Sequence, residues 1–187
     1  MKRALFIDKD GTLVQDVAFN ADPARLKIAT EVFPGLKHVQ DAGFLIVVVS
    51  NQPGVALGLF QESALSQVEY ELRLLLSKEE VSLEGFYYCP HHPSSTIPEY
   101  SATCLCRKPS PGLLLAAARD LDISLSDSWM VGDILDDVEA GRRAGCRTIL
   151  VDRGGETEWR LDEQLRQPDF ILSSVNEACR RVLEVSP

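Results

Sequence analysis

Short apolar runs rich in branched residues alternate with longer amphipathic stretches along the 187 residues, and this alternation constrains the fold more than any other feature. It is the pattern of repeated βα units, which build a mostly parallel sheet covered by helices. Strands are expected at residues 4–7, 44–49, 86–88, 129–131, 148–151 and 170–172. The sequence therefore predicts an α/β fold of Rossmann-like type, with helices on both faces of the sheet.

The stretches between these strands carry helix signals. A short helix is expected over 36–41, and apolar residues at helical spacing between Leu65 and Leu76 indicate a longer helix packed against the sheet. Ser110 and Pro111 fit an N-cap and a first helical residue, and Ser174 with Glu177 fits a capping box that opens the last helix. Segments 89–108 and 153–168 are expected to be loops. We find no repeat or linker, so residues 1–187 are expected to form one domain.

Composition excludes several classes of protein. The formal net charge of −9 disfavours attachment to nucleic acid or to anionic lipid. The longest apolar run, residues 44–49, is far shorter than the roughly 20 residues that cross a bilayer, and charges at positions 8–10 interrupt any signal-peptide core. Five cysteines without an export signal favour a reduced, cytoplasmic protein with metal or thiol chemistry. A monomer is expected.

Polar residues follow the strands at their expected carboxyl ends, where parallel sheets place their ligands. Asp8 and Asp10 follow the first strand within Asp-Lys-Asp-Gly-Thr, which taken alone could be an Asx-rich turn. Ser50 follows the second strand, and Asp133 follows the fourth. Lys108 precedes a helix.

Taken in order, these four motifs resemble those of the haloacid dehalogenase (HAD) superfamily of phosphatases. The resemblance implies that Asp8 attacks phosphorus and forms an aspartyl-phosphate, while Asp10 acts as general acid and base. It implies Mg²⁺ bound by the Asp8 and Asp133 carboxylates and the Asp10 carbonyl, and phosphoryl oxygens held by Ser50 and Lys108. No large cap domain is expected.

Simpler interpretations remain for single members of this set. Asp133 could be only a helix N-cap, Ser50 a turn residue and Lys108 a solvated charge. Asp137 is less clearly a metal ligand than Asp133, and could support Asp133 or Lys108 instead.

Three thiols and an imidazole stand in the proline-bearing loop at 89–108. The sequence Cys89-Pro-His-His-Pro precedes Cys104-Leu-Cys106, which provides a full tetrahedral Zn²⁺ set. Spacing alone does not separate His91 from His92, and the cysteines could be unrelated. Cys146 and Cys179 fit small apolar residues of helices or helix ends.

Together with the phosphatase motifs, this loop resembles the D-glycero-D-manno-heptose-1,7-bisphosphate phosphatase family over about residues 5–151. The resemblance implies Zn²⁺ bound by Cys89, His91, Cys104 and Cys106, and removal of the C7 phosphate of a sugar bisphosphate for nucleotide-activated heptose synthesis. Residues implied to bind the substrate are Asp16, Val17, Ala18, Phe19, Asn51, Gln52, Pro53, Arg107 and Ile134.

Leu57, Leu59 and Ile134 stand where the family often has basic residues, which leaves the exact substrate and its anomer open. Histidinol-phosphate phosphatase is the enzymatic alternative. A zinc-stabilised binding module without catalysis is the alternative of another class.

Overall fold

The computed structural model describes residues 1–101, 103–161 and 163–186, and its centre is one parallel six-stranded sheet. The strand order is β3-β2-β1-β4-β5-β6. The strands are β1 (Arg3–Ile7), β2 (Phe44–Asn51), β3 (Gly85–Cys89), β4 (Trp129–Gly132), β5 (Arg147–Val151) and β6 (Phe170–Leu172). All six predicted strands are confirmed, and this order is that of the doubly wound Rossmann type.

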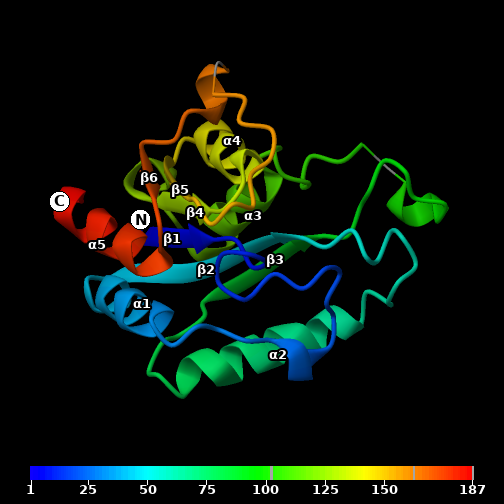
Figure 1. The fold of residues 1–187 in the computed structure, drawn as a ribbon, viewed down its shortest axis with the longest axis horizontal. Coiled ribbons are helices and arrows are strands. Elements are labelled where there is room, and N and C mark those ends of the chain that lie inside the picture. Colours follow the sequence, from blue (N-terminus) through cyan, green and yellow to red (C-terminus); the bar gives the residue numbers. More distant parts are fainter. Residues whose placement is uncertain (102, 162, 187) are drawn as a thin grey trace.

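In the described part of the chain, five α-helices connect and cover the strands (Figure 1). They are α1 (Val32–Asp41), α2 (Ala64–Ser77), α3 (Gly112–Leu121), α4 (Leu135–Ala144) and α5 (Val175–Val185). Four short 3-10 helices lie at Pro23–Arg25, Pro98–Tyr100, Leu125–Asp127 and Gln164–Arg166. The predicted loops at 89–108 and 153–168 are confirmed apart from these turns, with Cys89 closing β3; Ala102 and Asp162 lie outside the described residues.

The two faces of the sheet carry different helices because side chains alternate along a strand. Leu5 and Ile7 of β1 point into a core shared with α1, α2 and α5. Ala4 and Phe6 point into a second core shared with α3 and α4. The leucine stripe of α2 is buried against the first of these cores, as predicted, and Cys179 and Cys146 fill the first and second core respectively.

Helices α1 and α5 lie side by side although most of the chain separates them (Figure 1). A Cβ placed on Gly35 of α1 would come within 2.8 Å of Asn176 Oδ1 and 2.9 Å of Cys179 Cβ, both on α5. The glycine therefore permits the close approach of the two helices.

One predicted helix start is confirmed and one is wrong. Ser174 Oγ accepts a hydrogen bond from the Glu177 amide, although the Glu177 carboxylate bonds to Ser173 instead of completing a box. Ser110 does not cap α3: the N-cap is Pro111, no side chain caps it, and the Ser110 amide donates to the Arg107 carbonyl in the preceding turn. The chain is still turning at Ser110, so the helix begins two residues later, at Gly112.

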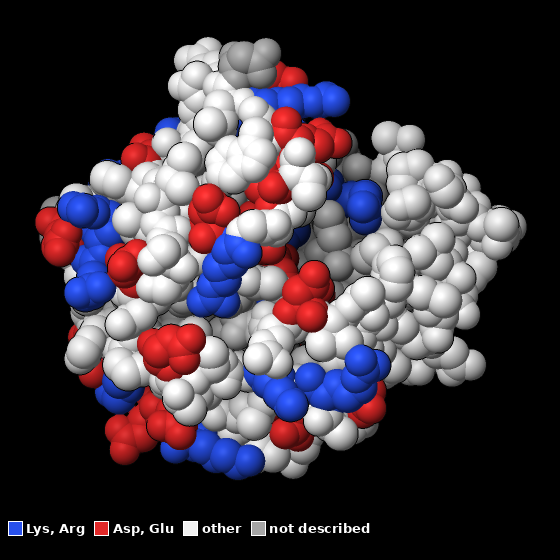
Figure 2. All heavy atoms as spheres, viewed as in Figure 1, with Lys and Arg blue, Asp and Glu red and all other residues white. Residues whose placement is uncertain are grey.

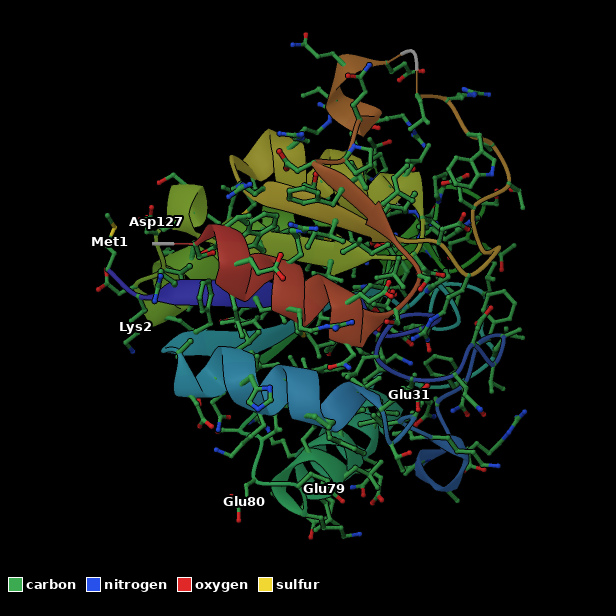
Figure 3. The ribbon with its side chains drawn as sticks, turned by 60° about the vertical axis from the view of Figure 1, so that its left-hand side comes forward. Met1, Lys2, Glu31, Glu79, Glu80 and Asp127 are labelled. Carbon is green, nitrogen blue, oxygen red and sulfur yellow. The ribbon has the colours of Figure 1, made fainter. Side chains whose placement is uncertain are left out.

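The register of the sheet aligns the strand ends that carry polar residues. Ile7 of β1 pairs with Val48 on one side and with Val131 on the other. The next residue, Asp8, is therefore level with the end of β4 at Gly132 and lies two residues short of the end of β2 at Asn51. Figure 3 shows Met1, Lys2 and Asp127 at the amino-terminal edge of the sheet, opposite the loops that follow these strand ends.

None of the helices in the described residues is long and apolar enough to span a membrane.

Candidate active site and metal centres

The tight turn after β1 places Asp8 at the carboxyl edge of the sheet. The Asp8 amide donates to the Val131 carbonyl at 2.9 Å, and the Leu13 amide donates to the Asp8 carbonyl at 3.2 Å. Gly11 has a φ of +83°, and a Cβ there would lie 2.3 Å from Asp133 Oδ2. The turn needs a glycine both for its backbone conformation and for the approach of Asp133.

Lys108 lies between two buried carboxylates. Its Nζ is 2.5 Å from Asp8 Oδ1 and 2.6 Å from Asp137 Oδ1, and it also donates to the Val49 carbonyl. The Lys108 side chain is 2 % exposed. Burial alone would lower the pKa of Lys108, but Asp137 and Asp8 raise it above its ordinary value, so the ammonium stays charged.

The acidic groups of this cluster are crowded. Asp8, Asp133 and Asp137 each direct a carboxylate oxygen to within 4.8 Å of the others. Burial raises the pKa of Asp8 to about 7, against the lowering effect of Lys108, and burial with the charge of Asp8 raises the pKa of Asp133 to about 6. The three carboxylates of this cluster carry more negative charge than the one ammonium of Lys108 can neutralise.

These observations fit a divalent cation. The donors are carboxylate oxygens, which Mg²⁺ prefers. The side chains of Asp8, Asp10, Asp133 and Asp137, with those of Lys9 and Lys108, leave a net charge of −2 when all are ionised, and one divalent ion would neutralise it. Thr12 Oγ1 donates to Asp133 Oδ1 at 3.0 Å and fixes this carboxylate.

Asp10 and Ser50 lie beside this cluster and are joined by one side chain. Gln52 Nε2 donates to Asp10 Oδ2 at 2.9 Å and to Ser50 Oγ at 2.8 Å. The other Asp10 oxygen accepts from Lys9 Nζ at 2.6 Å. The Asn51 side chain makes two hydrogen bonds with the Lys108 backbone: Nδ2 donates to the carbonyl at 3.1 Å and Oδ1 accepts from the amide at 3.0 Å, which ties the end of β2 to the segment that carries the lysine.

A second cluster gathers three thiols and one imidazole nitrogen. Cys89 Sγ lies 3.5 Å from Cys104 Sγ, 3.2 Å from Cys106 Sγ and 3.6 Å from His91 Nδ1. Such separations are close to those of ligands around one tetrahedral ion with bonds of about 2.0–2.3 Å. His92 points elsewhere, since its Nδ1 accepts from the Ser94 amide. The cluster could hold zinc.

The loop that carries this cluster, residues 89–108, packs against the segment after β2, residues 52–62. Ser95 Oγ donates to the Ala56 carbonyl at 2.6 Å. The hydroxyls of Tyr88 and Tyr100 both donate to the Glu62 carboxylate, at 3.1 and 2.8 Å. Figure 2, compared with Figure 1, shows that the lobe built from these two segments has hardly any charged side chains on this face, consistent with a sequence in which residues 52–61 are all uncharged.

Three cavities surround the carboxylate cluster. One of about 230 Å³ is lined by most of the predicted substrate-binding residues and by the acid/base candidate: Asp10, Asp16, Val17, Ala18, Phe19, Asn51, Gln52, Pro53 and Gly54. A second of about 280 Å³ includes Arg107 and Lys108, and a third of about 200 Å³ includes Ile134. Leu57 and Leu59 are exposed and line none of these three.

Sequence reasoning missed three side chains at this site: Lys9, Thr12 and Glu156. Lys9 and Thr12 lie within the Asp-Lys-Asp-Gly-Thr segment, so their position was a usable signal. Glu156 accepts from the Leu135 amide at the start of α4 and from the Glu158 amide. It stands in an irregular loop with no motif around it, and the sequence offers no signal for it.

A parallel sheet with an acidic, lysine-bearing cluster at its carboxyl edge fits the HAD-like class of phosphoric monoester hydrolases, and comparison with known proteins places the chain in this class. The family model described as HAD-hydrolase-like matches residues 105–178. A crystal structure of D,D-heptose 1,7-bisphosphate phosphatase from B. bronchiseptica, complexed with magnesium and phosphate, has a TM-score of 0.82 at 25 % identity and covers 97 % of this chain and 98 % of that chain.

Curated relatives show which family of HAD-like phosphatases the chain belongs to. The D-glycero-β-D-manno-heptose-1,7-bisphosphate 7-phosphatase of Yersinia pestis is 36 % identical over 172 residues, which cover 92 % of this chain and 90 % of that protein. The protein of the same name from Pasteurella multocida is 36 % identical over 176 residues and 94 % of each chain. The chain belongs to the D-glycero-β-D-manno-heptose-1,7-bisphosphate 7-phosphatase family of HAD-like phosphatases.

Proposed function

We propose that this phosphatase removes the C7 phosphate of D-glycero-β-D-manno-heptose 1,7-bisphosphate and yields heptose 1-phosphate for nucleotide-activated heptose synthesis. The names of the relatives support the substrate and its β anomer. The observation that carries the chemistry is the Lys108 ammonium at 2.5 Å from Asp8, with Asp133 and Asp137 beside it. The binding-module alternative lacks support because the named relatives are phosphatases.

Asp8 is the proposed nucleophile. One of its carboxylate oxygens attacks phosphorus, the bond from phosphorus to the C7 oxygen breaks, and an aspartyl-phosphate forms on Asp8. Lys108 and the Ser50 hydroxyl hold the phosphoryl oxygens, whose charge must be stabilised in the transition state. Lys108 is already desolvated and fixed by Asp137, so little reorganisation is needed.

Asp10 is the proposed general acid and base. Its carboxyl gives a proton to the leaving C7 oxygen, and the resulting carboxylate then takes a proton from the water that attacks the aspartyl-phosphate. That attack breaks the bond between phosphorus and the Asp8 oxygen, which releases inorganic phosphate and restores Asp8. Asp10 lines the 230 Å³ cavity, consistent with contact to the leaving group.

The Asp8 and Asp133 carboxylates and the Asp10 carbonyl would hold Mg²⁺. The ion would supply positive charge between the anionic nucleophile and the phosphate dianion. Asp137 is proposed to hold Lys108 instead, at 2.6 Å. Cys89, His91, Cys104 and Cys106 would hold a structural Zn²⁺ that orders the loop at 89–108.

Substrate recognition is assigned to the cavities around the cluster. Residues 16–19 and 51–53 would contact the sugar. Arg107 shares a cavity with Lys108 and would bind the second phosphate through its guanidinium group. Ile134, in the third cavity, would contact the substrate through its apolar side chain.

The experiment that tests this function measures the rate of phosphate release in the presence of Mg²⁺. It compares both anomers of the heptose bisphosphate with histidinol phosphate. The β anomer is expected to react fastest, and Asp8→Asn should abolish turnover while Asp41→Asn, at an exposed surface pair, should not. Faster release from histidinol phosphate would overturn the substrate. Unchanged turnover in Asp8→Asn would overturn the mechanism.

We further propose a cytoplasmic monomer with one domain and no nucleic-acid partner. The five cysteines are free thiols in the structure, which suits a reducing compartment, and the negative net charge opposes binding to nucleic acid. Light scattering should give the mass of a single chain, and unfolding should show one cooperative transition.

A further inference from the structure

The Asp10 carboxylate is held at both oxygens by side chains that are themselves buried. Lys9 Nζ lies 2.6 Å from Oδ1, and Gln52 Nε2 donates to Oδ2 at 2.9 Å. Lys9 is 0 % exposed and Gln52 is 3 % exposed, whereas the Asp10 side chain is 29 % exposed and faces the substrate cavity. Two buried groups therefore hold both oxygens of an otherwise accessible carboxylate.

Lys9 is buried and is hydrogen-bonded both at its backbone carbonyl and at its ammonium. Its carbonyl accepts from the Val14 amide at 2.9 Å, and the Gly11 amide donates to the Val14 carbonyl at 3.0 Å, so the turn is closed beneath it. A lysine is seldom buried completely, and its ammonium needs a partner when it is. The partner found here is the carboxylate of the next residue.

Gln52 connects two functional groups. Its amide nitrogen carries two hydrogens, and these are directed to Asp10 Oδ2 and Ser50 Oγ. Because the Ser50 oxygen accepts from Gln52, the Ser50 hydroxyl hydrogen remains available for donation to another acceptor. The backbone amide of Gln52 donates to the Cys89 carbonyl at 2.8 Å, which anchors the residue to the end of β3.

We propose that Lys9 and Gln52 are positioning residues that hold Asp10 in the conformation required for proton transfer, and that Gln52 also directs the Ser50 hydroxyl toward the phosphoryl group. This inference rests on the proposed role of Asp10 as general acid and base. Gln52 then arranges the catalytic groups in addition to lining the substrate cavity.

The test compares two esters that differ in their need for a proton. The 4-nitrophenolate ion leaves without protonation, whereas the alkoxide of an alkyl phosphate such as glycerol phosphate must be protonated as it leaves. Lys9→Met and Gln52→Met should each lower kcat on the alkyl phosphate by about ten- to a hundredfold, with KM changed less than about threefold. With 4-nitrophenyl phosphate, Lys9→Met should still form the phosphoenzyme fast and hydrolyse it slowly, so that a burst of 4-nitrophenol precedes turnover. In Gln52→Met, formation of the phosphoenzyme should also slow, because the Ser50 hydroxyl is no longer directed toward the phosphoryl group, but by less than kcat falls on the alkyl phosphate.

Lys9→Arg, which keeps the cation, should recover most of the activity lost in Lys9→Met. Lys37→Met is the matched control, because it removes a lysine from an exposed ion pair with Asp41. Should Lys9→Met fail to fold, Gln52→Met tests the same arrangement from another element.

Values of kcat within twofold of the native protein in both methionine variants would overturn the inference. So would losses that are equal on the two esters in every variant that folds, with no burst in Lys9→Met, which is the result of a merely structural role. The proposed function fails separately: Asp10→Asn would then retain activity, or the native protein would release no phosphate from the heptose bisphosphate.

Discussion

Replacement of Lys108 by methionine tests whether this ammonium holds the carboxylate cluster together. Methionine keeps much of the volume of the side chain but removes the cation that lies 2.5 Å from Asp8 and 2.6 Å from Asp137. Both carboxylates are buried, and they would then face each other without that charge between them. We expect Lys108→Met to be strongly destabilised at pH 8 in the absence of Mg²⁺.

The size of the effect follows from the burial of the pair. Removing one partner from a buried ion pair costs about 3–5 kcal/mol. In a chain of this length, 1 kcal/mol shifts Tm by about 2–4 °C, so Tm should fall by about 6–20 °C.

The loss should be smaller at pH 6. The pKa of Asp8 is already raised to about 7 with Lys108 present, and it rises further when this cation is removed. Below that pKa, the folded variant binds a proton that the unfolded chain, with its ordinary aspartate pKa of 3.8, does not bind. Stability of the variant therefore rises as the pH falls from 8 to 6.

Thermal and urea unfolding would measure both effects in buffer without Mg²⁺ and without chelator, since a chelator would also remove metal from the thiol cluster. Lys78→Met, at an exposed lysine after α2, is the control and should leave Tm unchanged. The reasoning is refuted if Lys108→Met loses less than about 1 kcal/mol at pH 8, or loses the same amount at both pH values.

Three further predictions concern the metal centres. Gly11→Ala should weaken Mg²⁺ binding measured by calorimetry, because its Cβ would displace Asp133. The control is Gly43→Ala, which has a similar φ of +89° with open space around it and should cost only backbone strain of about 1–2 kcal/mol. Equal Mg²⁺ affinity in the two variants would contradict this expectation. Mg²⁺ should raise Tm more at pH 8 than at pH 6, because Asp8 and Asp133, with pKa values of about 7 and 6, must lose protons to bind it; a shift independent of pH would argue against a site at these carboxylates. Cys104→Ser should lose bound zinc and become sensitive to proteolysis within 89–108, while His92→Ala should retain the metal, and metal analysis that finds the reverse would exclude the four-ligand set.

The strands and the Cys/His cluster of the loop at 89–108 could be predicted because their signals are local. Continuous apolar runs such as residues 44–49 indicate strands buried on both faces, and a Cys-x-His pair followed by a Cys-x-Cys pair indicates a common ligand set. Spacing did not separate His91 from His92. The fold separates them, because only the His91 imidazole reaches the three sulfurs.

The missed features depend on tertiary contacts. Ser110 has the composition of an N-cap, but the turn that places Lys108 in the active site continues through it and delays α3 to Gly112. The partnership of Asp137 with Lys108 and that of Lys9 with Asp10 depend on how the strand ends meet. A loop residue such as Glu156, which bonds to the first amide of α4 from a distant loop, leaves no pattern in the sequence.

The packing of α1 against α5 has a consequence for synthesis on the ribosome. The chain emerges from its amino end, so the residues of α1 are synthesised long before those of α5, the helix that covers one side of α1. During that interval the apolar residues Val32, Leu36 and Val39 lack Ala178, Cys179 and Val182 as neighbours. The nascent protein therefore exposes these apolar residues to solvent until α5 has left the exit tunnel. During this interval a chaperone that binds exposed apolar segments would find its largest binding surface.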